Sequence, residues 1–295
     1  MKYELKVRYM QEVGSRSNQE DAIYPAPDNI TNSARCFVLC DGVGGHDSGE
    51  VASNAVCRAL GGYIDENFDE TALFTADDFR TALQATYDYL DTCDTHENKK
   101  MATTMVFLAL HAGGALVAHI GDSRVYHLRP GCGILFETHD HSLVNDLIRM
   151  GRLTEEAAKN FERRNVITRV MQPNTPRRFG ADIRETGDVK AGDIFFLCSD
   201  GVNETLESKH IADILLDERW NDDEKMERIR QFTVNSRDNH TAIFVRVCAV
   251  IPSVDELPSM PVEKSVASYS RWCKFLLLLF LLSAIIAAVI AIVFL

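Results

Sequence analysis

Short apolar runs recur along the first 250 residues of the chain. They predict β-strands at 3–10, 34–40, 101–110, 114–120, 124–129, 179–186, 193–199 and 241–248. Segments with apolar residues three and four positions apart predict helices at about 48–66, 76–96, 141–150, 154–160, 207–217 and 222–236. Two long helices follow each other between early strands, so strict β–α–β alternation fails. The pattern favours an α+β fold of antiparallel sheets with helices outside them.

Two glycine-containing pairs separate three of these neighbouring runs. Gly113-Gly114 stands between residues 101–110 and 114–120, and Gly121-Asp122 stands between 114–120 and 124–129. Glycine allows the tight turns that hairpins require. The spacing therefore predicts three successive antiparallel strands.

The C-terminal stretch 275–295 has a different pattern, because it holds no charged residue and only Ser283 is polar. A helix of this length is roughly 30 Å long, enough to cross the hydrocarbon core of a bilayer. Arg271 and Lys274 precede it, which favours a cytoplasmic location for the preceding residues. Residues 251–270 are rich in proline and serine and read as a linker. We predict a domain over 1–250, a linker over 251–270 and a single-pass, tail-anchored membrane segment over 271–295.

Composition narrows the class of protein further. Hydrophobic residues make up 46% of the chain, enough to build a full core. The net charge of −12 argues against a nucleic-acid partner. The eight cysteines form no C-x-x-C pair, which is typical of reduced core cysteines in a cytosolic domain.

Acidic residues at strand ends are the strongest chemical signal. Each of four aspartates follows or precedes an apolar run beside Gly or Asn: Asp41, Asp122, Asp200 and Asp238. A single Asp-Gly pair usually indicates a turn. Four such sites together with Glu20-Asp21 are hard to attribute to chance, and they indicate a shared function. Clustered carboxylate oxygens suit Mg²⁺ or Mn²⁺, and no pair has zinc-ligand spacing.

Seven short motifs occur in this order: Arg16-Ser17-Asn18-Gln19-Glu20-Asp21, Asp41-Gly42-Val43-Gly44-Gly45-His46, Thr103-Thr104, Gly121-Asp122-Ser123-Arg124, Asp140-His141-Ser142, Ser199-Asp200-Gly201 and Asp238-Asn239. Together they closely resemble the type 2C family of metal-dependent protein serine/threonine phosphatases, in its bacterial form. The resemblance covers about residues 3–248. It implies two antiparallel β-sheets sandwiched between outer helix pairs, with a mobile flap at about 141–180.

The resemblance also implies a set of metal ligands in a cleft at one end of the sandwich. Asp41 would bridge two Mn²⁺ or Mg²⁺ ions, and Asp122 with Asp200 would form a third, weaker site. The remaining assignments place Asp200 and Asp238 in the first site, Glu20 and the carbonyl of Gly42 in the second, and Asp21 and Asn239 as supports beside the ligands.

Phosphate chemistry agrees with these roles. Arg16 offers a planar fork of donors for a phosphate dianion, and it matches the family residue that grips the phosphate. Two metal ions about 3.5–4 Å apart can orient water for in-line attack on phosphorus. No C-x₅-R loop of a cysteine-dependent phosphatase is present. The catalytic residues expected are Arg16, Asp41 and Asp200, with His46 as a candidate proton donor whose alternative role is to fix its loop.

The other histidines have simpler explanations. His139 and His141 resemble a metal-binding pair, but the Asp140-His141-Ser142 sequence is typical of a helix start. His111, His119 and His127 fall on separate predicted strands. We expect these three to be surface or structural residues.

The sequence thus predicts a membrane-tethered phosphatase that hydrolyses phosphoserine and phosphothreonine in proteins without a phosphoenzyme. Its expected partners are phosphoproteins, those of a cognate kinase above all, and the lipid bilayer. Two alternatives stay open: a catalytically silent signalling or scaffold module of the same fold, and a phosphatase of a small phosphorylated metabolite. The complete ligand set argues against the silent module. The metabolite alternative survives because the metals contact only the phosphate.

Overall fold

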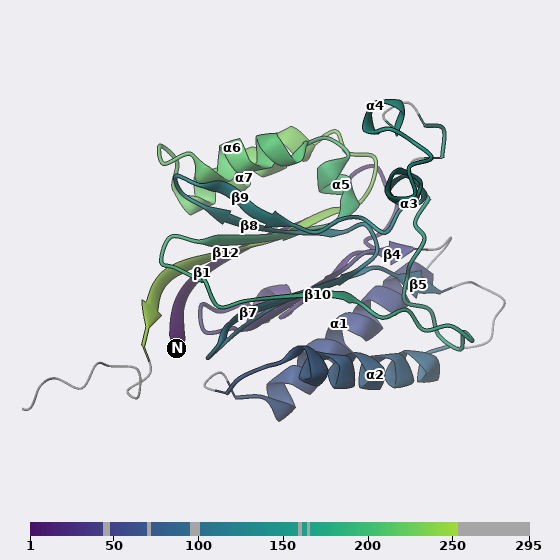
Figure 1. Ribbon diagram of the computed structural model, residues 1–295, viewed down its shortest axis with the longest axis horizontal. Coiled ribbons are helices and arrows are strands. Elements are labelled where there is room, and N and C mark those ends of the chain that lie inside the picture. The colour runs from purple at the N-terminus through teal and green to yellow at the C-terminus, as the bar shows by residue number, and fades with distance from the viewer. Residues whose placement is uncertain (44–47, 70–71, 95–100, 159–160, 164–165, 253–295) are drawn as a thin grey trace, which may run out of the picture. The chain divides into compact units, whose positions relative to one another are not determined.

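Strands that are apolar on both faces build two stacked antiparallel sheets (Figure 1). The computed structural model describes residues 1–252 apart from 44–47, 70–71, 95–100, 159–160 and 164–165. The first sheet has the order β1 (Lys2–Glu12), β12 (His240–Ile251), β11 (Ile194–Cys198), β8 (Arg124–Arg129) and β9 (Gly133–Glu137). The second has the order β10 (Asp182–Thr186), β7 (Gly114–Ile120), β6 (Met105–His111), β3 (Cys36–Cys40) and β2 (Ala22–Tyr24). A separate pair joins β4 (Gly42–Val43) to β5 (Ala102–Thr103).

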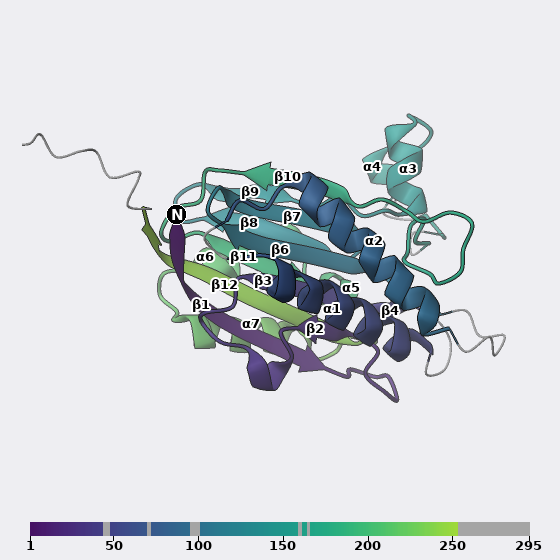
Figure 2. The same cartoon turned by 90° about the horizontal axis from the view of Figure 1, so that it is seen from below.

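Helices cover the outer face of each sheet. On one side lie α1 (Ser48–Asn67) and α2 (Ala76–Thr92), which run across the second sheet (Figure 2). On the other side, α6 (Ser208–Leu216) and α7 (Asp222–Thr233) pack on the first sheet. The short helices are η1 (Pro27–Asn29), α3 (Leu143–Arg149), α4 (Glu155–Ala158) and α5 (Asp200–Asn203).

The alternation of side chains along each strand divides the core into three apolar layers. In β3, Phe37 and Leu39 face the opposite sheet, whereas Val38 and Cys40 pack toward α1 and α2. All five residues of β3 are buried. Burial on both faces explains why this strand reads as an unbroken apolar run in the sequence.

The predicted fold class is confirmed: two antiparallel sheets lie between flanking helices. One detail of the prediction was wrong. Strands β6 and β7 do pair as a hairpin, but β8 lies in the other sheet, between β11 and β9. The chain crosses between sheets at Gly121, whose φ of +112° lies in a region open mainly to glycine. The crossing carries Asp122 to the ends of both sheets.

Several short elements were not predicted. The run 101–110 divides at Thr104 into β5 and β6, and β2, β4, β9 and α5 were not expected from the sequence. Strands β2 and β4 have three and two residues, too few for alternation to show. Residues 253–270 of the expected linker and the expected membrane segment lie outside the described residues. Among the helices that are described, none has the length and apolar character of a membrane span.

Candidate metal centre

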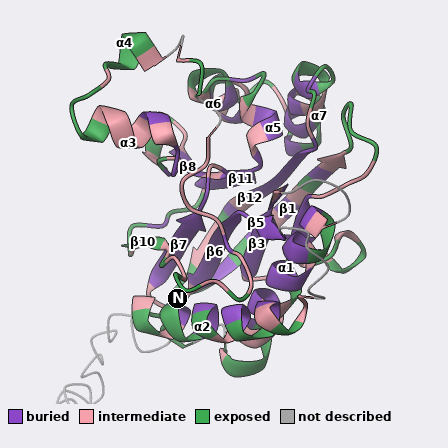
Figure 3. Cartoon of the chain, turned by 90° about the vertical axis from the view of Figure 1, so that its right-hand side faces the viewer, coloured by how far each residue is buried: buried purple, intermediate pink, exposed green. Residues whose placement is uncertain are grey.

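The acidic strand ends of both sheets meet at one end of the sandwich, which faces the viewer in Figure 3. Asp41 follows β3, Asp122 follows the end of β7, and Asp200 follows β11 as the first residue of α5. Asp238 lies just before β12, and Glu20 and Asp21 lie just before β2. The structure therefore brings together the carboxylates that the sequence placed at strand ends.

Two threonines hold the main chain of Asp41. Its amide donates to Thr104 Oγ1 (3.0 Å), and its carbonyl oxygen accepts from the Thr104 amide and Thr103 Oγ1, both at 2.8 Å. Thr104 Oγ1 also lies 2.8 Å from Ser123 Oγ, beside Asp122. The Thr103-Thr104 motif thus fixes the positions of two acidic loops at once.

A close contact between three segments requires glycine at two positions. The amide of Gly42 donates to the carbonyl of Glu20 (3.1 Å). A Cβ atom on Gly42 would lie 2.5 Å from the main chain of Gly49, and one on Gly49 would lie 2.9 Å from Glu20 Oε2. The Glu20 carboxylate and the Gly42 main chain can approach one another only because both positions are glycine.

Asn239 connects the loop of Arg16 and Glu20 to Asp238. Its side-chain amide donates to the carbonyls of Val13 (2.8 Å) and Asn18 (3.0 Å), and its Oδ1 accepts from the Glu20 amide (2.8 Å). Its own main-chain amide donates to Asp238 Oδ1 (2.8 Å). Asn239 therefore braces two of the proposed ligand positions.

The buried carboxylates repel one another. Burial, followed by the charges of Asp200, Asp21 and Asp122, raises the pKa of Asp41 well above its usual range. Burial and the charge of Asp238 raise the pKa of Asp200. Burial raises the pKa of Asp21 to about 7, against a hydrogen bond from Ser199 Oγ (2.8 Å), and the pKa of Asp122 to about 8. Negative charge is crowded here without enough positive charge to balance it.

Two buried oxygens in this cluster have no hydrogen-bond donor among the described residues: Asp122 Oδ1 and Asp200 Oδ1. Unpaired buried carboxylate oxygens are costly unless something binds them. Hard divalent cations prefer oxygen ligands of this kind. The donor set thus fits Mg²⁺ or Mn²⁺, and the ligand assignments themselves stay predictions.

Arg16 supplies positive charge at the rim of the cluster. Its guanidinium forms an ion pair with Asp238, and its side chain is 51% exposed. A half-exposed guanidinium beside the carboxylates is available to a phosphate group. The candidate proton donor His46 lies outside the described residues.

The raised pKa values predict that the metal-free protein loses stability as pH rises from about 4 to about 8. Unfolded aspartates lose their protons near pH 4, whereas folded Asp21 and Asp122 keep theirs until the pH reaches their raised pKa values of about 7 and about 8. The folded state then binds more protons than the unfolded state, so the free energy of unfolding falls with pH. Thermal melts in EDTA test this. Asp122→Asn should reduce the fall, and an equal fall in that variant would contradict the assignment.

A second group of possible ligands lies elsewhere in the fold. Atoms of His119, His141 and Asp182 lie within 4.8 Å of one another. The three residues are far apart in sequence and no motif links them, so the sequence carries no signal of this group. The predicted helix start at His141 is confirmed, since Ser142 Oγ accepts from the Asn145 amide as the N-cap of α3.

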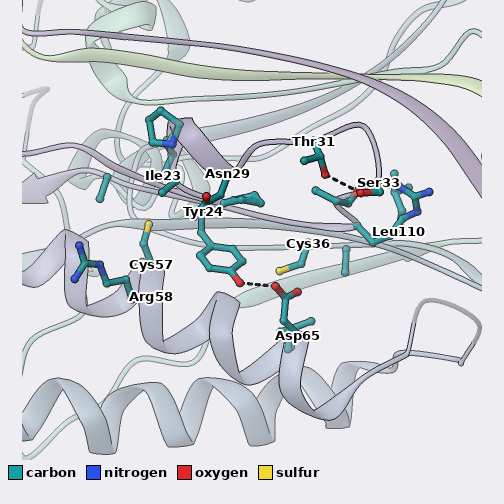
Figure 4. A pocket seen from close by; sticks show the side chains of 18 of the residues that line it. Ile23, Tyr24, Asn29, Thr31, Ser33, Cys36, Cys57, Arg58, Asp65 and Leu110 are labelled. Carbon is teal, nitrogen blue, oxygen red and sulfur yellow. Dashed lines mark hydrogen bonds between the residues drawn. The ribbon is translucent and has the colours of Figure 1, made fainter.

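A large cavity of about 1000 Å³ lies apart from the proposed metal ligands, between the β2–β3 connection and α1 (Figure 4). The Tyr24 side chain points toward α1, where its hydroxyl donates a hydrogen bond to the Asp65 carboxylate. Of the acidic cluster, only Asp21 lines this cavity. The carboxylate arrangement, and not the volume of a hollow, therefore identifies the candidate site.

Comparison with known proteins agrees with this geometry. The family model described as protein phosphatase 2C matches residues 13–232. The chain belongs to the protein phosphatase 2C family, the metal-dependent protein serine/threonine phosphatases. It is 31% identical over 227 residues to protein phosphatase PhpP of Streptococcus pneumoniae, covering 72% of this chain and 84% of that protein.

Solved structures show the same fold. The serine/threonine phosphatase PstP/Ppp of Mycobacterium tuberculosis superposes with a TM-score of 0.69 and 28% identity, over 82% of this chain and 98% of that chain. A structure of the PstP catalytic domain contains two manganese ions, and it matches with a TM-score of 0.66 and 27% identity over the same shares.

Proposed function

We propose that this chain hydrolyses phosphoserine and phosphothreonine in proteins, with water as the direct attacking group. The observation that carries the proposal is the convergence of buried, incompletely paired carboxylates beside the exposed guanidinium of Arg16. Two divalent ions held here would supply positive charge that activates water and neutralises the phosphate. The ligands would be Asp41, Asp200, Asp238, Glu20 and the carbonyl of Gly42, with Asp122 in a third, weaker site.

The surrounding residues have distinct tasks in this proposal. Arg16 binds the non-bridging phosphate oxygens through charge-assisted hydrogen bonds. Asn239 keeps the Arg16–Glu20 loop against Asp238, and Ser199 orients the buried Asp21. No side chain of the chain has to form a covalent bond with phosphorus.

An assay on three kinds of substrate tests this function. The purified protein is given phosphothreonine peptides, phosphoserine peptides and small phosphorylated metabolites, each with Mn²⁺ or with EDTA. We expect Mn²⁺-dependent release of phosphate from the peptides, in preference to the metabolites. Preference for a metabolite would support the second alternative, and no turnover of any substrate would support a silent scaffold.

We further propose that residues 275–295 anchor the enzyme in a membrane, with the catalytic domain on the cytoplasmic side. The support is the uncharged stretch itself, because each large apolar side chain left in water forgoes about 1.5–3 kcal/mol of burial. Arg271 and Lys274 favour the orientation. The linker, as a flexible coil, spans roughly 25 Å, so the active site would stay near membrane-bound kinases and their phosphoproteins.

Cell fractionation tests the anchor. We expect the full-length protein to sediment with membranes and to resist extraction by high salt, because burial of apolar surface is insensitive to charge screening. A truncation after residue 270 should be soluble and should turn over phosphopeptides at the same rate. Release of the full-length protein by salt alone would show that the stretch does not span a bilayer.

A further inference from the structure

His141 is bound twice to Gly121, the residue before Asp122. The His141 main-chain amide donates to the Gly121 carbonyl (2.9 Å), and the Gly121 amide donates back to His141 Nδ1 (3.1 Å). The His141 side chain is 1% exposed, so water does not compete for these bonds. These two hydrogen bonds fix the main chain of Gly121 at the point where the chain crosses between sheets.

The position of Asp122 depends on Gly121. Gly121 has a φ of +112°, and a Cβ atom there would lie 2.6 Å from Thr104 Cβ. Thr104 also holds Asp41, and Oδ1 of Asp122 has no donor among the described residues. A small shift of Gly121 would therefore displace Asp122 relative to Asp41, with no other side chain fixing that oxygen.

The other ring nitrogen of His141 faces the end of the flap segment. Because Nδ1 accepts from the Gly121 amide, the ring proton is on Nε2, which lies 3.2 Å from Asp182 Oδ2 at the start of β10 but has no hydrogen-bond partner among the described residues. Burial, followed by the charge of His119, lowers the pKa of His141 to about 4, so the ring is neutral. The ring of His119 stacks on it at 4.5 Å with an interplanar angle of 7°.

This proton assignment argues against a metal ion at His119, His141 and Asp182. A metal would need the lone pair of His141 Nε2, which carries the proton. The second carboxylate oxygen of Asp182 is bound to Arg169 Nη1 (2.9 Å), whose positive charge would repel a cation. The three residues are better explained as a packed junction, in which two stacked imidazole rings lie beside the Asp182–Arg169 ion pair.

The junction joins both ends of the flap segment. Main-chain bonds bring the chain back to His141, since the Thr168 amide donates to the His141 carbonyl (2.7 Å) and the Leu143 amide to the Val166 carbonyl (2.8 Å). Asp182, bound to Arg169, closes the far end. The His141 ring therefore contacts both Gly121 and Asp182, the residue at the far end of the flap segment.

We propose that His141, at the base of the flap segment, is a positioning residue that holds Asp122 in the metal centre through its two hydrogen bonds to Gly121. The inference rests on the proposed function only in taking Asp122 as a metal ligand. It deepens that function by giving the flap segment a defined connection to the weaker metal site.

Two substitutions separate the two ends of the ring. Asparagine places an oxygen near the position of Nδ1, so His141→Asn can still accept from the Gly121 amide. Glutamine reaches the position of Nε2, so His141→Gln keeps only the contact with Asp182. In the metal-free full-length protein, we expect hydrogen exchange of the peptide containing Gly121 to rise about tenfold in His141→Gln, the effect of losing one buried hydrogen bond, and to stay near wild type in His141→Asn.

Metal and rate measurements complete the test. His141→Gln should need several-fold more Mn²⁺ for saturation by calorimetry, with kcat lowered and KM for phosphopeptide unchanged, whereas His141→Asn should be closer to wild type. The matched control is His127→Asn, since His127 is also buried, stacks on Phe195 at 4.3 Å and contacts Asp193 at 2.9 Å. It should lower the melting temperature and change neither Gly121 exchange nor Mn²⁺ binding.

Two outcomes would overturn the proposal. If both His141 variants lost one equivalent of bound Mn²⁺ or Zn²⁺ while Gly121 exchange stayed normal, the junction would be a metal site. If the two variants behaved alike in exchange and in Mn²⁺ affinity, His141 would only fill space. Exchange and Mn²⁺ binding are measured without substrate, so both remain decisive even if the proposed phosphatase activity fails.

Discussion

Replacing Asp41 by asparagine is expected to abolish turnover while making the metal-free protein more resistant to heat. Asp41 lies between Asp200, Asp21 and Asp122, whose charges raise its pKa after burial. An amide of the same size removes the charge that would hold two cations, so kcat should fall at least about 100-fold, or ~2.7 kcal/mol. The same change relieves repulsion in the metal-free cluster, so the melting temperature in EDTA should be equal or higher. Phosphopeptide kinetics and thermal melts measure the two effects.

Because kcat should fall while the melting temperature should not, the variant distinguishes a loss of catalysis from a loss of folding. Asp200→Asn should behave in the same way, because Asp200 is also buried in the cluster. Asp222→Asn is the matched control, since Asp222 is a buried aspartate that binds Arg246 (2.7 Å) and Lys6 (3.2 Å) away from the cluster. It should lower the melting temperature and keep kcat. More than about a tenth of wild-type kcat in Asp41→Asn, a loss under ~1.4 kcal/mol, would refute its bridging role.

Replacing Arg16 by alanine is expected to weaken phosphopeptide binding more than it slows turnover. The guanidinium would bind the phosphate in the ground state and in the transition state alike, and its loss should raise KM. A charge-assisted hydrogen bond contributes about 1.5–3 kcal/mol, so kcat/KM should fall about 10- to 100-fold. Michaelis kinetics at saturating Mn²⁺ measure both parameters. Arg16→Lys keeps the charge but not the planar fork, and should fall between alanine and wild type.

The contact between Arg16 and Asp238 complicates this variant, because alanine also frees a proposed ligand. Mn²⁺ affinity should therefore be measured in parallel, and it should rise or stay constant as the competing cation is removed. Arg237→Ala is the control for a lost positive charge, since Arg237 is exposed and directly precedes Asp238. It should change KM little. If kcat fell in Arg16→Ala and KM did not rise, Arg16 would act on the transition state and not as a clamp on the bound phosphate.

Much of the fold could be predicted because burial leaves a local trace. The apolar runs ending at Cys40 and Cys198 are strands with both faces covered, and the helices at 48–66 and 76–96 are found within a few residues of α1 and α2. The pattern of apolar residues does not show to which sheet each strand belongs. Strand β8 follows β7 after three residues yet pairs with β11, some 70 positions away. Pairing across that distance is a matter of packing, which single-sequence periodicity does not contain.

The sequence by itself determined which charged residues make up the candidate site: the acidic strand ends at Asp41, Asp122, Asp200 and Asp238, and Arg16, the proposed phosphate-binding residue. These residues can be recognised in the sequence because a charged residue beside glycine at the end of an apolar run is uncommon. Only the tertiary structure decided which polar groups are buried together. Asp21 and Asp122 owe their raised pKa values to neighbours from other strands, and His141 meets Gly121 and Asp182 through the sheet crossing and the return of the flap segment. Desolvation and charge repulsion depend on distances in space, and those distances exist only once the two sheets have packed.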